Sequence, residues 1–174
     1  MTTAQQEQLF REWTDAHRGI LFKAAHAFAF ESDRDDLMQE MLLSLWRAIP
    51  VFREGCKPST FVYRVAHNAA LNWQRGRRNY RNRLDRFEAE SRAEHPSGVA
   101  PSFEHADDRL RSLYLAIQQL PETDRSLVLL YLDDLSYSEM AEVLGITESN
   151  IGVRLNRIKK KLTQMIEKEP YEHG

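Results

Sequence analysis

Apolar residues recur every three or four positions along most of the chain, which is the period of an amphipathic α-helix. Apolar and polar residues do not alternate over enough positions to predict a β-strand. One helix is predicted over about residues 6–28. A second is predicted from the candidate N-caps Ser32 and Asp33 to Pro50, which ends it. Both carry an apolar stripe, so we expect them to share a core in an all-α protein.

A third helix is predicted after a loop that contains Gly55 and Pro58, with Ser59 or Thr60 as its N-cap and its end near Asn79. Its inward face is apolar: Val62, Val65, Ala66, Ala69 and Trp73. Its other face is a polar stripe with spacings of four, four and three residues: Arg64, Asn68, Asn72 and Arg75. We expect the polar stripe to face outward.

The helical periodicity stops between residues 81 and 108, where Pro96, Gly98 and Pro101 occur. This composition predicts a flexible linker at residues 81–108, between two domains at residues 1–80 and 109–168. Domains of this size bury modest cores.

The second domain has the pattern of a helix-turn-helix. Ser136 or Ser138 is the candidate N-cap of a short helix, Gly145 supplies the turn, and Thr147 is the candidate N-cap of a longer helix. The longer helix has one apolar face: Ile151, Leu155, Ile158 and Leu162. Its solvent side carries donors that suit base edges and phosphates: Ser149, Asn150, Asn156, Arg157 and Lys160, together with Val153.

The composition of the 174 residues, 42% hydrophobic and 29% charged, excludes collagen, disulfide scaffolds and wholly disordered chains. The single cysteine, Cys56, cannot form an intrachain disulfide, which favours a reducing compartment. No apolar run reaches the roughly 20 residues of a membrane span, and the first residues lack the layout of an export signal. We therefore expect a cytoplasmic protein.

The formal net charge of −2 hides blocks of opposite sign. Residues 31–40 hold five acidic residues and one arginine, residues 73–86 hold six arginines and one aspartate, and residues 147–163 hold five basic residues and one glutamate. Two separated basic stretches suit contact with a polyanion at two places. Aromatic residues near the first basic stretch suit unpaired bases. The acidic block suits a basic protein partner, although a helix N-terminus accounts for part of it.

An enzyme is not expected. The six histidines have no metal-binding spacing, and the chain has no phosphate-binding glycine loop, nucleophile elbow or paired-carboxylate motif. The sequence therefore predicts no catalytic residue, metal or cofactor, and no small-molecule substrate.

Three segments in order resemble the extracytoplasmic-function (ECF) sigma factors of bacteria, a group within the sigma-70 family. DRDDLMQEMLLSLWRAI at residues 33–49 is similar to the region that binds the β′ clamp helices of RNA polymerase. STFVYRVAHNAALNWQRGRRN at residues 59–79 is similar to the regions that melt and read the −10 element. Residues 120–162 are similar to the domain that reads the −35 element. The resemblance implies a sigma factor that binds core RNA polymerase, including the β flap, and directs promoter-specific initiation.

The resemblance also assigns site residues. Those expected to contact core polymerase are Asp35, Asp36, Gln39, Glu40 and Trp46. Those expected at the −10 element are Phe61, Arg64, Asn68, Asn72, Trp73, Arg75 and Arg78, with Phe61 and the loop before it receiving an extruded base. Those expected at the −35 element are Ser149, Asn150, Val153, Arg154, Arg157, Lys159 and Lys160. Gly152 departs from the family, which commonly has a DNA-reaching side chain there.

An anti-sigma factor, in some cases membrane-anchored, is implied as a regulatory partner, and the protein would work at the nucleoid. The acidic linker would follow the RNA path of polymerase or serve only as a solvated tether. The main alternative is an autonomous helix-turn-helix regulator whose N-terminal domain dimerises or senses a ligand. It explains only the C-terminal half of the chain. A helical nuclease is a third reading, but the sequence has no credible metal cluster.

Overall fold

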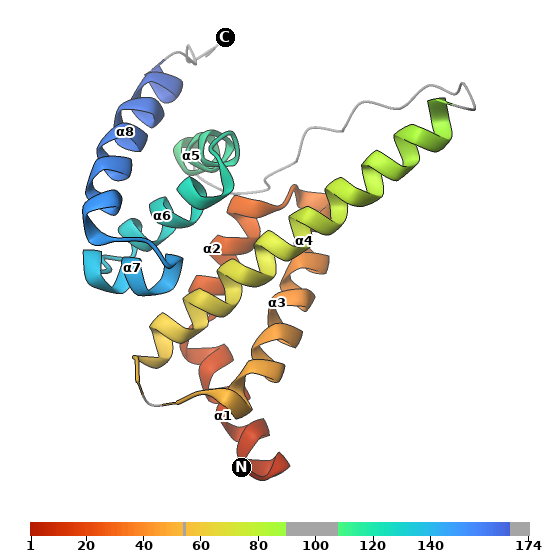
Figure 1. Ribbon diagram of the computed structural model, residues 1–174, viewed down its shortest axis with the longest axis vertical. Helices are drawn as coiled ribbons and strands as arrows, with labels where there is room; N and C mark the ends of the chain where they lie inside the picture. Colours follow the sequence, from red (N-terminus) through yellow and green to blue (C-terminus); the bar gives the residue numbers. More distant parts are fainter. Residues whose placement is uncertain (54, 90–107, 168–174) are drawn as a thin grey trace.

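Helices form the whole framework of the computed structural model, which describes residues 1–53, 55–89 and 108–167 (Figure 1). The helices are α1 (Thr3–Ala16), α2 (Arg18–Phe28), α3 (Arg34–Ala48), α4 (Pro58–Ala89), α5 (Asp108–Gln118), α6 (Glu122–Leu132), α7 (Tyr137–Leu144) and α8 (Glu148–Glu167). Two 3-10 turns, Glu31–Asp33 and Ile49–Val51, flank α3. These described ranges contain no strand, so the all-α prediction is confirmed.

The single helix predicted over residues 6–28 is wrong, because the chain breaks at His17 into α1 and α2. His17 has φ −117° and ψ 19°, outside the helical range, and α1 begins at a capping box between Thr2 and Gln5. On α1, Trp13 packs edge-on against the rings of Phe52 and Phe61 at 4.9 and 5.8 Å.

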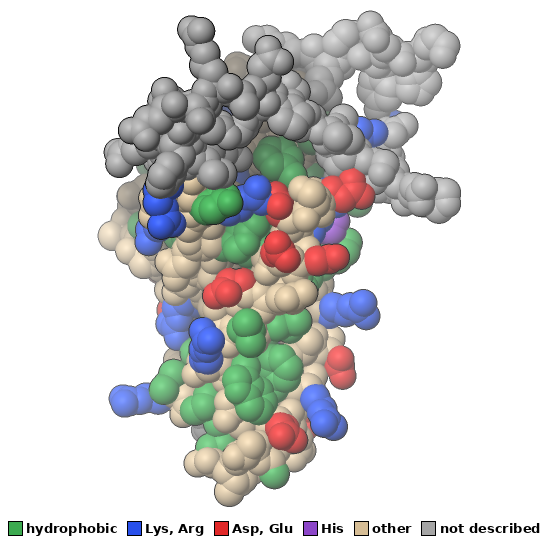
Figure 2. All heavy atoms as spheres, turned by 90° about the vertical axis from the view of Figure 1, so that its right-hand side faces the viewer, with side chains coloured by type: hydrophobic (Ala, Val, Ile, Leu, Met, Phe, Trp, Pro, Cys, Tyr) green, Lys and Arg blue, Asp and Glu red, His purple; other side chains and the backbone are tan. Residues whose placement is uncertain are grey.

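The apolar stripe predicted for the second helix is confirmed in α3. Leu37, Met41 and Leu45, together with Ile49 just beyond the helix, are fully buried. Asp33 precedes the helix, but its side chain makes no capping hydrogen bond and pairs instead with Arg77 of α4. The opposite side of α3 faces solvent on the side of the molecule that Figure 2 presents, where acidic side chains lie next to an apolar area.

α4 is longer than the third helix predicted. It begins at Pro58, where proline is well tolerated because the first helical N–H needs no partner, and it continues to Ala89. Residues 81–89 of the predicted linker are therefore helical, since no glycine or proline interrupts them. Asp108, the last residue of the predicted linker, begins α5, and residues 90–107 lie outside the described residues. The predicted inward face is buried at Val62, Ala66 and Ala69.

The predicted helix-turn-helix is present as α7 and α8. Ser136 and Glu139 form a capping box at the start of α7, and Gly145 ends it with φ 67°, a left-handed conformation that glycine adopts without strain. The Thr147 hydroxyl accepts the backbone N–H of Asn150 at 3.3 Å, which caps α8 as predicted.

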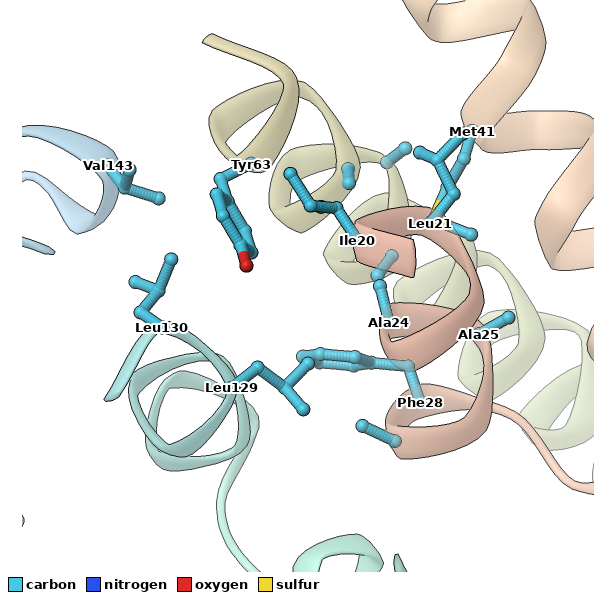
Figure 3. Close-up of a cluster of buried hydrophobic side chains, with 14 of the residues drawn as sticks. Ile20, Leu21, Ala24, Ala25, Phe28, Met41, Tyr63, Leu129, Leu130 and Val143 are labelled. Atoms are coloured by element: carbon cyan, nitrogen blue, oxygen red, sulfur yellow. The ribbon is translucent and has the colours of Figure 1, made fainter. Parts of the chain in front are cut away.

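α5 and α6 pack against α2, and α6 and α7 pack against α4, so one core runs through both halves of the chain. In Figure 3 the ring of Phe28 lies beside Leu129, and the ring of Tyr63 lies on the side of α4 that faces Leu130 and Val143. Polar contacts also cross this boundary. The Gln118 side chain donates to the carbonyls of His26 and Ala29 at 2.7 and 3.2 Å, and His67 of α4 hydrogen-bonds Ser126 of α6.

The position of His67 predicts a pH-dependent stability. Burial between α4 and α6 lowers its pKa from the ordinary 6.5 to about 4, so the unfolded chain binds a proton there that the folded chain does not. The free energy of unfolding should therefore decrease as pH falls from about 6.5 to about 4.

Denaturant unfolding of the wild type and His67→Gln at neutral and mildly acidic pH checks this. Glutamine cannot be protonated but can still hydrogen-bond Ser126, so the variant should lose less stability on acidification. An equal loss in both proteins would contradict the prediction.

Candidate nucleic-acid interface

The polar stripe of α4 lies on the surface, as the sequence predicts. Asn68, Asn72 and Arg75 are exposed, and Arg64 is partly exposed with its guanidinium 5.5 Å from the ring centre of Phe61. The side chains supply amide and guanidinium donors along one side of a helix, an arrangement suited to bases and phosphates.

Phe61 differs from the expectation that it receives an extruded base. Only 6% of its surface is exposed, and its ring packs against Trp13 and Phe52, so it belongs to the core. The aromatic surface lies further along α4, at Trp73 and the exposed Tyr80.

Trp73 and Tyr80 line a hollow of about 370 Å³ between α3 and α4. The Arg77 guanidinium lies 5.0 Å from the centre of the Trp73 ring, and Asn72 lines the same hollow. Arg77 and Tyr80 were absent from the predicted set. Their spacing from Trp73, four and seven residues on one helix, could have identified them.

Several cations of this surface pair with carboxylates from other helices. Arg77 pairs with Asp33, and Lys57 lies 2.6 Å from Glu139. The hydrogen bonds from Lys57 and from Ser136 lower the pKa of Glu139 to about 2, so this carboxylate stays charged at neutral pH.

The exposed side of α8 presents Ser149, Asn150, Val153 and Lys160 to solvent, with Val153 71% exposed. Lys159 is also exposed but turns toward α6, where its ammonium group donates to the Tyr131 hydroxyl at 2.9 Å.

Arg154 differs from these side chains because it holds α8 to α6. Its guanidinium bonds one oxygen of the Asp124 carboxylate at 2.9 and 3.0 Å, and Asp124 is buried. The other oxygen of Asp124 lies 3.5 Å from Arg157, whose side chain is 67% exposed. A buried carboxylate needs such partners, so Arg154 contributes to packing while Arg157 remains available to a ligand.

Gly152 lies beneath Tyr137, the first residue of α7. A Cβ atom at Gly152 would lie 3.5 Å from a ring carbon of Tyr137, an ordinary van der Waals distance. Tyr137 is 44% exposed and so forms part of the surface where Gly152 offers no side chain. The predicted set did not include Tyr137, and the contact depends on the packing of α7 on α8.

The predicted polymerase-binding residues share the outer side of α3. Asp35, Asp36 and Gln39 are exposed and Glu40 is partly exposed. Trp46 is only partly exposed, because its ring packs edge-on against Phe10 at 5.5 Å.

Leu43 lies among these residues on the same side of α3 and is 49% exposed. The face therefore combines negative charge with apolar surface, the composition of a protein-binding site. The prediction missed Leu43, although its spacing from Gln39 and Trp46 is a usable signal.

Comparison with known proteins identifies the family of both halves of the chain. The family model described as sigma-70 region 2 matches residues 14–80, and the model described as sigma-70 region 4 matches residues 110–162. The ECF RNA polymerase sigma-E factor of Escherichia coli K12 is 30% identical over 145 residues, which cover 78% of this chain and 74% of the relative. The chain belongs to the ECF sigma factors of the sigma-70 family.

Other similar proteins agree with this family. The RNA polymerase sigma factor YlaC of Bacillus subtilis is 24% identical, with 94% of this chain and 95% of YlaC covered.

Two solved structures have the same fold. One is Bartonella quintana RpoE in complex with the anti-sigma factor NepR, with a TM-score of 0.69, 17% identity and coverage of 94% and 99% of the two chains. The other is CnrH in complex with the cytosolic domain of CnrY, with a TM-score of 0.62, 22% identity and coverage of 95% of each chain.

The structure describes residues 1–53, 55–89 and 108–167 of this sigma factor. Among them, no helix has the length and apolar character needed to cross a membrane. The same residues contain no group of three or more histidine, cysteine, aspartate or glutamate side chains able to hold a metal ion.

Replacing Gly152 by alanine should stabilise the protein by about 0.5–1 kcal/mol, because alanine favours a helix interior and the new methyl group only touches Tyr137. Denaturant unfolding measures the change. Gly145→Ala is the contrasting variant and should destabilise the protein, because Gly145 has a positive φ. A loss of stability in Gly152→Ala would contradict the conclusion that a Cβ atom fits beside the Tyr137 ring.

Proposed function

We propose that this ECF sigma factor docks on core RNA polymerase through the outer side of α3 and reads two promoter elements with α4 and α8. One observation carries the proposal: a single chain presents an acidic and apolar face on α3 and separate donor-rich faces on α4 and α8. Residues 1–80 would act as region 2 and residues 109–168 as region 4, joined by residues 81–108, of which residues 81–89 continue α4. The chemistry is binding and strand separation, with no catalytic residue.

At the −10 element, Arg64, Asn68, Asn72, Arg75 and Arg78 would hold the backbone and bases of the separated strand. Phe61 lies in the core, so the hollow beside Trp73 is the better candidate for stacking with a base in this conformation. Unstacking costs a few kcal/mol per base step and stacking on an aromatic ring returns about 1–3 kcal/mol, so opening needs the binding energy of the polymerase complex.

At the −35 element, Ser149, Asn150 and Val153 would face base edges, while Arg157 and Lys160 would contact phosphates. Val153 can offer an apolar contact to a thymine methyl group. Arg154 would act mainly by holding α8 on α6 through Asp124.

The remaining partners are proposed from surfaces and from relatives. An apolar groove of about 550 Å³ between α5, α6 and α8, with Leu113, Leu132 and Ile166 among its lining residues, suits the β flap of polymerase. The complexes of Bartonella RpoE with NepR and of CnrH with CnrY support regulation by an anti-sigma factor. The protein would act in the cytoplasm at the nucleoid, held inactive by that partner, which can itself be membrane-anchored.

The deciding experiment adds the purified chain to bacterial core RNA polymerase and a genomic promoter library, and maps RNA start sites. A sigma factor should produce new starts that share two sequence elements. An autonomous helix-turn-helix regulator would instead bind duplex DNA alone without redirecting initiation. No association with core polymerase would reject the proposal.

Reversing one charge on α3 should weaken polymerase binding. Asp36→Lys places a cation on the proposed docking face and is expected to reduce affinity for core polymerase about tenfold or more. Titration of fluorescently labelled protein with core enzyme measures this. Asp15→Lys on α1 makes the same change of charge outside that face and should leave the affinity unchanged; equal affinities in the two variants would reject the assignment.

Two variants of α8 should separate base contacts from phosphate contacts. Asn150→Ala is expected to cost about 1–3 kcal/mol on the preferred −35 sequence and to relax specificity at one position. Lys160→Ala should weaken binding to all duplexes alike and lower its salt dependence. Competition binding with single-base variants of a mapped promoter distinguishes the two patterns, and uniform weakening by Asn150→Ala would refute its base contact.

A further inference from the structure

Region 4 places carboxylates against cations at and before α4. Three ion pairs join the two: Lys57–Glu139 at 2.6 Å, Arg64–Glu142 at 3.8 Å, and Arg78–Glu122. Each pair joins positions at least 44 residues apart, so tertiary packing creates all three.

Two of the three cations, Arg64 and Arg78, lie on α4, and Lys57 directly precedes the first residue of the helix. Arg64 and Arg78 are fourteen residues apart, and multiples of seven return to nearly the same side of an α-helix. At a rise of about 1.5 Å per residue, they lie about 20 Å apart along α4. Arg64 and Arg78 are two of the proposed −10 contacts, so the carboxylates of region 4 occupy part of the proposed DNA surface.

Residues that lie between the paired cations along the chain fix the register of α4 against α6. Tyr63 faces Leu130 in Figure 3, and His67 hydrogen-bonds Ser126, so the facing position on α6 moves toward its N-terminus as the chain advances along α4. The next pair, Arg78 with Glu122, follows the same order. The carboxylates are thus held against α4 by a shared apolar core.

We propose that Glu122, Glu139 and Glu142 take the place of promoter phosphates on α4, so that region 4 closes the −10 surface of the free sigma factor. This inference rests on the proposed −10 role of α4. The carboxylates and DNA would compete for the same cations, so docking of region 4 and binding of nucleic acid at these cations would exclude each other. Lys57, which the sequence prediction did not include, would become a further DNA contact in the open form.

The test weakens the docked state while leaving the proposed DNA-binding residues unchanged. The variant E122K/E142K sets like charges against Arg78 and Arg64 and keeps Glu139, which caps α7. The matched control, E7K/D15K, makes the same change of net charge at exposed positions of α1. The probe is a fluorescein-labelled 20-nucleotide oligo(dT), titrated with full-length protein at low salt without polymerase and followed by anisotropy.

E122K/E142K should bind the oligonucleotide at least fivefold more tightly than E7K/D15K. A second measurement reports the opening itself: spin labels at R11C and K161C, in a C56S background, should give longer distances in E122K/E142K than in the control. Equal affinity in the two variants would overturn the proposal, as would tighter binding without longer distances, because added charge alone would then explain the gain.

Circular dichroism checks whether E122K/E142K keeps its helical structure. If it does not, the oligonucleotide affinity and the spin-label distances of the single variant E142K are compared with those of E7K. The same comparison applies, since Glu142 is exposed and its ion pair is the longest of the three. Association of the wild type with core polymerase is measured separately. Its failure rejects the sigma-factor proposal, whereas equal oligonucleotide affinities with normal polymerase binding reject only self-closure.

Discussion

The structure depends on α4 burying one side while keeping charged side chains on the other. Val62, Ala66 and Ala69 are buried, and these small side chains allow α2 and α3 to approach closely. The solvent-facing side of α4 carries arginine and asparagine side chains. Because a helix is rigid, any contact that fixes the buried side also fixes where the cations point.

Tyr63 and His67 extend this constraint to region 4. Both lie between the buried and polar sides of α4, and both meet α6 or α7. Burial of Phe28 and Tyr63 against leucine and valine side chains of region 4 supplies the apolar part of the contact, since apolar surface leaves water. The surrounding ion pairs are partly exposed and individually weak, so they act mainly on orientation and on competition with other anions.

The site was only partly predictable from sequence. Local spacing sufficed for Asn68, Asn72, Asn150 and Lys160, because helical periodicity alone puts them on the solvent side. It did not suffice for Phe61, because the burial of that ring depends on Trp13 and Phe52 from other parts of the chain. Arg154 followed the same pattern: its partner Asp124 lies 30 residues away and on another helix.

The amino-acid sequence by itself determined the all-α class, the apolar stripes, the caps of α7 and α8 and the glycine turn between them, because these depend on residues within one or two helical turns. It also carried the motif order that marks the family. Tertiary structure alone decided the break at His17 and the pairing of region 4 carboxylates with cations at and before α4. These depend on which distant surfaces exclude water together, and no local pattern encodes that choice.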